Sequence, residues 1–174
     1  LLAKTAASLD AISNGRVELG VGLGWQEEEY EASGIPFDQR VKTFWETLDI
    51  CQSLWTGGPV SHKGEIFEFN DIWCHPTPPQ GSDIPLLFGV KMTEFNAQKI
   101  AKIGHGWIPI KTSRDFISEG SEKLNHAFKE AGRDDKPRIR GQLPTCVDSN
   151  GVPSVELTLK ELEKSMEAGL EEIE

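Results

Sequence analysis

The feature that most constrains the fold is the alternation of helical and strand-like segments along the whole chain. Apolar residues recur at helical spacing in residues 2–12, 41–55, 93–103, 113–131 and 161–174. Between them lie short apolar segments of strand length, at residues 16–22, 84–89, 106–110 and 138–147. Strict alternation requires crossover connections, which give parallel strands and a mainly parallel sheet. These strands are too few to close a barrel of eight, so they fit half of one or a small open sheet.

Turn chemistry predicts the remaining connections. The Ser-Asn-Gly sequence at residues 13–15 ends the first helix, because Asn and Gly tolerate the left-handed conformation of a helix terminus. Residues 60–69 alternate around a Lys-Gly pair and predict a small hairpin. The stretch 24–38 carries a run of glutamates and predicts a loop, whose last residue, Asp38, caps the next helix. The prolines between residues 76 and 79 predict a stiff connector.

Composition and charge bound the class of protein. The 174 residues carry 18 Lys and Arg against 28 Asp and Glu, a net charge of −10, so nucleic acid is not an expected partner. No apolar run approaches the roughly 18 residues of a membrane-spanning helix, so no membrane partner is expected. The cysteines are far apart, which favours free thiols in a reducing, cytoplasmic compartment. We expect one partial domain over residues 1–174, truncated at both ends, because both ends fall within helical patterns.

The first candidate site lies where the first predicted strand ends, in the sequence Gly20-Val21-Gly22-Leu23-Gly24-Trp25. Glycines at the carboxyl end of a parallel strand let a flat ligand approach the backbone closely. Ligands collect at that end in barrels and open sheets alike. The third glycine falls one place too early for a dinucleotide-binding GxGxxG, and an acidic loop follows instead of a helix. The alternative is that the glycines only relieve crowding between the strand and packed helices.

The second candidate site is Phe88-Gly89-Val90-Lys91-Met92-Thr93, where a strand end runs into a helix start. Backbone N–H groups and the helix dipole favour an anion at such a position. Lys91 and Thr93 add a positive charge and a hydroxyl group to it. The alternative is a solvated lysine beside a threonine that simply caps the helix.

Other side chains give weaker signals. The histidines, at positions 62, 75, 105 and 126, lack metal-like spacing, so no metal site is expected. His105 lies between two glycines at a predicted strand start, where a histidine is more often structural than catalytic. The glutamates between residues 27 and 31 are typical of a solvated face. Trp25 and Trp107 adjoin the glycine turns, where an aromatic side chain is suited to line a pocket.

Short pieces of sequence along nearly the whole chain match one known family in the right order. They are Leu9-Asp10-x-x-Ser13-x-Gly15-Arg16, Glu18-Leu19-Gly20-Val21-Gly22-x-Gly24-Trp25, Glu29-Tyr30, Gly34-x-Pro36-Phe37, Arg40 with Glu46, Leu54-Trp55, Pro76-x-Pro78-x-Gln80, Ile84-Pro85, Gly104-x-Gly106-Trp107 and Ala131-Gly132-Arg133-Asp134. Taken together, they resemble the bacterial luciferase-like family of flavin- or deazaflavin-dependent oxidoreductases and monooxygenases. No single piece would carry the resemblance alone.

The resemblance implies an α/β fold, a TIM-type (β/α)8 barrel of which this chain covers roughly the third to the seventh helix. The first three strands and the eighth would be missing. It also implies FMN, or a deazaflavin coenzyme of the F420 type, bound at the carboxyl ends of the strands. The residues implied in cofactor binding are Gly22, Leu23, Gly24, Trp25, Gly89, Val90, Lys91 and Thr93.

Two places depart from the family pattern. Val90 and Lys91 stand where the family usually has a glycine and a small residue, and the lysine charge offsets the stiffer backbone. His105 stands where an acidic residue is common. The acid–base residues of the family tend to lie on the early strands that this chain lacks. Glu29 and His105 are therefore the remaining candidates for a catalytic role.

The resemblance leaves two reactions open. In one, reduced flavin meets oxygen and the resulting peroxide attacks an organic substrate. In the other, which the glycine and Gly-Trp pieces favour, a deazaflavin carries a hydride without oxygen. We expect a small-molecule substrate and a homodimer for the full-length protein, and no activity for this segment alone. The alternatives are a non-catalytic flavin-binding protein and a half-barrel that serves assembly only.

Overall fold

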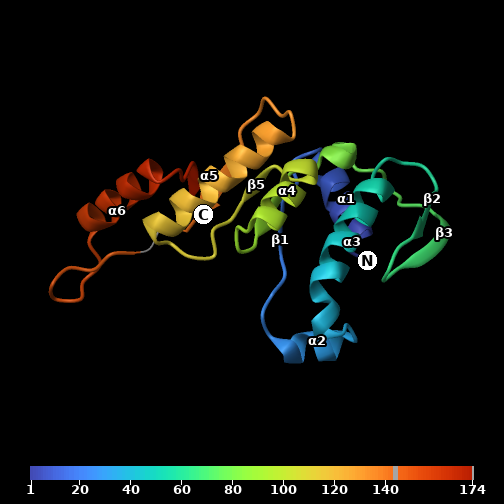
Figure 1. Cartoon of the computed structure of the whole chain (residues 1–174), viewed down its shortest axis with the longest axis horizontal. Coiled ribbons are helices and arrows are strands. Elements are labelled where there is room, and N and C mark those ends of the chain that lie inside the picture. The colour runs from blue at the N-terminus through green and yellow to red at the C-terminus, as the bar shows by residue number, and fades with distance from the viewer. Residues whose placement is uncertain (143–144, 174) are drawn as a thin grey trace. The chain divides into compact units, whose positions relative to one another are not determined.

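The computed structural model describes residues 1–142 and 145–173, and Figure 1 shows the order of the helices and strands. The chain forms two compact units. The first consists of Leu1–Leu19 with Leu23–Pro85, and the second of Gly20–Gly22 with the chain from Leu86 onward. The second unit therefore takes one short piece from within the sequence of the first.

The first unit is built on two helices, α1 (Leu2–Ser13) and α3 (Arg40–Leu54), which pack together. The core joins small residues of α1 to large ones at and after α3: Ala3, Ala6, Ala7, Trp45, Leu48, Cys51, Leu54 and Trp55. The buried indole of Trp55 donates a 2.9 Å hydrogen bond to the carbonyl oxygen of Ala3. As predicted, α1 ends at Asn14 and Gly15, whose φ angles are 57° and 78°.

The predicted hairpin is present after α3 and extends to Ile72. Its strands, β2 (Val60–Lys63) and β3 (Glu68–Ile72), pair antiparallel, with Val60 opposite Ile72 and Lys63 opposite Glu68. The proline-containing connector that follows includes a short 3-10 helix, η2 (Gly81–Asp83). The chain then enters the second unit.

Two details of the first unit differ from the prediction. The segment expected to be a loop contains a helix, α2 (Glu27–Ser33), and a 3-10 turn, η1 (Phe37–Gln39). No residue of α2 is buried, so this helix lacks the apolar stripe by which a sequence usually reveals one. Asp38 lies within η1, and Gln39 is the residue that precedes α3. The prediction that Asp38 caps this helix is therefore wrong.

The second unit is an α/β structure around a sheet whose strands lie in the order β1-β4-β5-β6-β7. The strands are β1 (Leu19–Gly22), β4 (Leu86–Gly89), β5 (Gly106–Trp107), β6 (Arg138–Gly141) and β7 (Glu172–Ile173). The connecting helices are α4 (Glu94–Ile103), α5 (Arg114–Glu130) and α6 (Val155–Glu167). The pairs from β4 to β7 are parallel, with Leu87 opposite Gly106 and Arg140 opposite Glu172. The predicted parallel sheet is confirmed.

The core of the second unit includes both faces of the sheet. Leu86, Leu87 and Phe88 are buried in succession, as expected for a strand that is covered on both sides. The ring of Trp107 is fully buried as well, and it packs against α5 at Gly120. A Cβ at Gly120 would lie 2.2 Å from this ring, so the close approach of β5 and α5 requires glycine there.

The C-terminal part differs most from the prediction. A helix is predicted through residue 174, but α6 ends at Glu167 and the chain turns at Gly169, which has a φ of 108°. The residues that follow form β7, paired with β6. The expected partial barrel is confirmed, and the short strand β7 follows its last helix. The strands β5 and β6 are shorter than predicted, and residues 143–144 of the predicted strand 138–147 lie outside the described residues.

Candidate functional site

The neighbouring strands β1 and β4 both end in glycine, and these two glycines lie against each other. A Cβ on Gly22 would lie 3.1 Å from the carbonyl oxygen of Gly89, and a Cβ on Gly89 would lie 3.6 Å from that of Val21. Along β1, Leu19 and Val21 are half-buried, whereas the two glycines are exposed. The two adjacent strands therefore end with backbone close to backbone, and Gly22 is exposed there.

The loop that follows Gly89 is fixed at several points. The carbonyl oxygen of Val90 accepts a 2.8 Å hydrogen bond from the indole nitrogen of Trp107, and that of Lys91 accepts one of 2.9 Å from the Asn96 amide side chain. The hydroxyl oxygen of Thr93 accepts a 3.2 Å hydrogen bond from the Asn96 N–H and so caps α4. These bonds hold the loop between β4 and the start of α4 in one conformation.

The side chains of this loop point to different environments. Val90 is buried, whereas Lys91 and Thr93 are exposed. The threonine therefore does what the simpler alternative expects of it, and the lysine is solvated. The fully buried Trp107 anchors the loop from within the core, so the expectation that Trp107 lines a pocket is not met.

The three residues after Gly22 belong to the first unit, where they form a bend. Gly24 has a φ of +68°, a conformation that favours glycine. The carbonyl oxygen of Leu23 accepts a hydrogen bond from the hydroxyl of Tyr30 in α2. Trp25 is 81% exposed, the most exposed of the tryptophans. Sequence reasoning did not single out Tyr30 as a functional residue, although it stands within the Glu29-Tyr30 piece of the family resemblance.

The two residues predicted to be catalytic lie in different places. Glu29 is exposed in the first turn of α2, and a catalytic role for it stays a prediction. His105 immediately precedes β5, where its Nδ1 accepts a 3.3 Å hydrogen bond from the Leu86 N–H at the start of β4. The backbone of His105 also bridges Leu86 and Arg138, with N···O distances of 2.9 Å. His105 thus lies at the amino end of these strands, and the structure does not bring it together with Gly22 and Gly89.

Another part of the resemblance forms a buried junction in the first unit. The carboxylate of Asp10 accepts hydrogen bonds from the Val17 N–H at 3.2 Å, the Gln80 N–H at 3.0 Å and the Gln80 side chain at 2.8 Å. The same amide group of Gln80 donates to the Val17 carbonyl oxygen at 2.9 Å. Val17 precedes β1 and Gln80 precedes β4 in the sequence, so the junction joins two segments of the first unit that lie far apart along the chain. In a TIM-type barrel, residues at the amino ends of the strands contribute to stability, whereas ligands bind at the carboxyl ends.

Residues 1–142 and 145–173 contain neither a metal-binding cluster nor a membrane-spanning helix. No group of three or more His, Cys, Asp or Glu side chains in these residues is arranged to hold a metal ion. Among the same residues, no helix is long and apolar enough to cross a membrane.

Comparison with known proteins identifies the family. Residues 1–155 match the family described as luciferase-like monooxygenase. The chain belongs to the luciferase-like monooxygenase family. An uncharacterized protein from Mycobacterium tuberculosis is 40% identical over 139 residues, which are 79% of this chain and 48% of that protein. The pyrimidine monooxygenase RutA of Yersinia enterocolitica is 31% identical over 147 residues, covering 77% of this chain and 38% of that enzyme. The chain thus spans about half the length, or less, of these relatives.

Solved structures confirm the fold. An F420-dependent secondary alcohol dehydrogenase in complex with an F420–acetone adduct matches with a TM-score of 0.80 at 19% identity, over 99% of this chain and 67% of that one. The oxygenating constituent of 3,6-diketocamphane monooxygenase from Pseudomonas putida, in complex with FMN, gives 0.67 at 20% identity, over 84% of this chain and 45% of that one. This chain is therefore part of a luciferase-like barrel.

Proposed function

We propose that the protein carrying this chain is an oxidoreductase that binds a flavin or a deazaflavin and acts on a small organic substrate. The observation that carries the proposal is the meeting of Gly22 and Gly89 at the ends of adjacent strands, where a Cβ on Gly22 would lie 3.1 Å from a backbone oxygen. A side chain at this point would crowd the neighbouring strand, so the edge stays bare. A planar cofactor ring needs such a surface to approach the backbone.

The residues around Gly22 and Gly89 suit the ring and the phosphate of such a cofactor. Gly22 and the bend that follows it, Leu23–Trp25, would contact the ring. The loop from Gly89 to Thr93 would hold the phosphate, because Lys91 is exposed and the start of α4 favours negative charge. The hydroxyl oxygen of Thr93 already accepts a hydrogen bond, which leaves its proton available for a phosphate oxygen.

When bound, the cofactor supplies the redox chemistry, and the protein supplies position and shielding. The fixed loop after β4 would hold the phosphate in one place, since both Val90 and Lys91 are tied through their carbonyl oxygens. The similar proteins include a pyrimidine monooxygenase, an F420-dependent secondary alcohol dehydrogenase and a monooxygenase in complex with FMN. They support FMN and the F420 type as the two cofactors to test.

Titration of the full-length protein with FMN and, separately, with F420 tests the proposal. We expect saturable binding of one of them, followed by the change in chromophore absorbance and fluorescence. Gly22→Val should weaken binding by about tenfold or more, which corresponds to about 1.4 kcal/mol, while the circular dichroism spectrum stays the same. Gly58→Val is the matched control, because a Cβ at Gly58 meets nothing within 4 Å. No binding of either cofactor at saturating concentration would overturn the proposal.

A further inference from the structure

We infer that Tyr30 is a positioning residue that holds the Leu23–Trp25 bend in its cofactor-binding conformation. This inference rests on the proposed function and adds to it a residue outside the predicted site. The Leu23–Trp25 bend directly follows β1 and lies outside regular secondary structure. Its conformation must therefore be set by contacts rather than by strand pairing.

Tyr30 contacts the bend in two ways. Its hydroxyl donates a hydrogen bond to the carbonyl oxygen of Leu23, seven residues earlier. Its ring lies beside Gly24, 3.8 Å from the point where a Cβ would stand if the glycine had one. The hydroxyl thus fixes the direction of the peptide before Gly24, whose φ is +68°.

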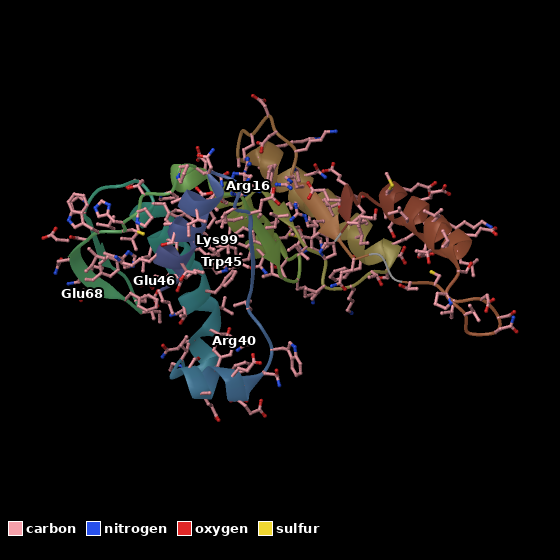
Figure 2. The ribbon with its side chains drawn as sticks, turned by 180° about the vertical axis from the view of Figure 1, so that it is seen from behind. Arg16, Arg40, Trp45, Glu46, Glu68 and Lys99 are labelled. Carbon is pink, nitrogen blue, oxygen red and sulfur yellow. The ribbon has the colours of Figure 1, made fainter. Side chains whose placement is uncertain are left out.

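The tyrosine ring is itself held from the other side. Tyr30 meets Phe37 of η1 edge to face, with ring centroids 5.4 Å apart and an interplanar angle of 77°. The guanidinium of Arg40 lies 3.9 Å from the Phe37 ring centroid and donates a 2.8 Å hydrogen bond to the Phe37 carbonyl oxygen. Figure 2 shows Arg40 at the end of α3 that lies beside α2. A chain of contacts therefore runs from the core helix α3 through Phe37 and Tyr30 to Leu23.

This arrangement leaves Trp25 projecting from an anchored bend. Trp25 is 81% exposed, so the burial of its own side chain does not hold it in place. An aromatic ring in this state can stack on a planar ligand only if the backbone beside it is already ordered, because ordering it on binding would cost conformational entropy. The Tyr30 hydroxyl provides this order before the ligand arrives.

The test compares two single-hydroxyl deletions within α2 of the full-length protein. Tyr30→Phe keeps the ring and its contacts with Gly24 and Phe37 but removes the bond to Leu23. Ser33→Ala removes a hydroxyl that donates to the Tyr30 carbonyl oxygen at 2.9 Å and does not contact the bend. We expect Tyr30→Phe to raise the dissociation constant for the bound cofactor about fivefold, as the loss of one neutral hydrogen bond would. Ser33→Ala should bind as the wild type does.

A second readout separates positioning from general stability. Trp45, Trp55 and Trp107 are buried, so among residues 1–174 a Trp73→Phe background leaves Trp25 as the exposed tryptophan, and the signal that is lost on Trp25→Phe isolates its quenching by acrylamide. Bound cofactor should protect Trp25 from quenching in this background and protect it less when Tyr30→Phe is added, with unchanged thermal unfolding. Equal affinity and equal protection in Tyr30→Phe would overturn the inference, and so would a loss of binding that is matched by a fall in melting temperature. A wild type that binds no cofactor would instead refute the proposed function itself.

Discussion

Asp10 is fully buried, and a single carboxylate there serves three hydrogen-bond donors from two distant parts of the chain. Burial raises the pKa of this carboxyl group, but the hydrogen bonds from Gln80 and Val17 outweigh it and hold the pKa below its ordinary value. Ionisation of the Asp10 carboxyl group therefore stabilises the folded state. Glutamine suits this position because its side-chain amide carries two N–H groups. One donates to Asp10 and the other to the Val17 carbonyl oxygen.

We predict that the Asp10 junction makes stability depend on pH in the acid range. A carboxyl group with a lowered folded pKa contributes fully above its unfolded pKa of about 3.9, and the contribution is lost as the pH falls through the folded pKa. Asp10→Asn should therefore lower the free energy of unfolding by about 2 kcal/mol at pH 7 and by less at pH 3. Urea denaturation at both pH values measures this. The exposed Asp49→Asn is the control, and an Asp10→Asn effect of the same size at pH 3 and pH 7 would contradict the prediction.

At the scale of elements, Glu46 joins the β2–β3 hairpin to α3. Its carboxylate accepts hydrogen bonds from the N–H groups of Phe67 at 2.8 Å and Ile66 at 3.1 Å, and it lies 3.0 Å from Nε2 of His62. Burial raises the pKa of Glu46, and these donors, led by the Phe67 N–H, bring it below its ordinary value. A Cβ at Gly64 would lie 2.0 Å from the carboxylate oxygen of Glu46, so a side chain there would displace this carboxylate. Figure 2 shows Glu46 on α3 and Glu68 on the hairpin.

We expect Glu46→Ala to loosen the hairpin because several backbone N–H groups of the turn lose their acceptor. Amide hydrogen exchange at residues 65–67 should become faster by about tenfold or more, while exchange in α1 stays unchanged. Glu68→Ala is the matched control, since its ion pair with Lys63 spans 3.8 Å between exposed side chains and contributes little. Equal exchange rates in the two variants would show that strand pairing alone holds the turn.

The elements that were predictable from sequence are those with a buried stripe. The helices α1, α3, α4 and α5 each bury an apolar face, and periodicity reveals them within a few residues. The helix α2 buries nothing, so it leaves no such pattern. The pattern of α6 continues past its end, because one turn at Gly169 stops a helix without changing the residues around it. The strand β7 has two residues, too few for alternation to show.

The candidate site was predictable to a similar extent. The glycines that end β1 and β4 can be recognised in the sequence, because the absence of a side chain is a property of the residue type itself. Which side chains lie near these glycines depends on the register of the strands and on how distant segments of the chain fold. Thus His105 and Trp107 flank the same glycine in sequence, yet one supports the amino ends of the strands and the other lies in the core. Tyr30 reaches Leu23 only because α2 turns the chain back, which no local pattern indicates.

At the scale of the whole molecule, the second unit is incomplete without residues 20–22. We predict that the fragment from Leu86 to the end of the chain is unstable, because β4 loses the strand beside it and exposes an unpaired edge. The fragment should unfold at lower urea concentration than the chain of residues 1–174, and it should associate in size-exclusion chromatography with light scattering. A monomeric fragment with the same urea midpoint as the longer chain would contradict this prediction.

The split origin of the second unit also has a consequence for biosynthesis. The strand β1 leaves the ribosome before β4, which follows only after α2, α3 and the hairpin have been made. Until then β4 is not available to pair with β1. Its sequence, Leu-Gly-Val-Gly, is suited to this delay because two glycines leave little apolar surface for other chains to bind. Since joining strands so far apart in sequence is slow, the sheet is completed late, after the helices of the first unit have had time to form.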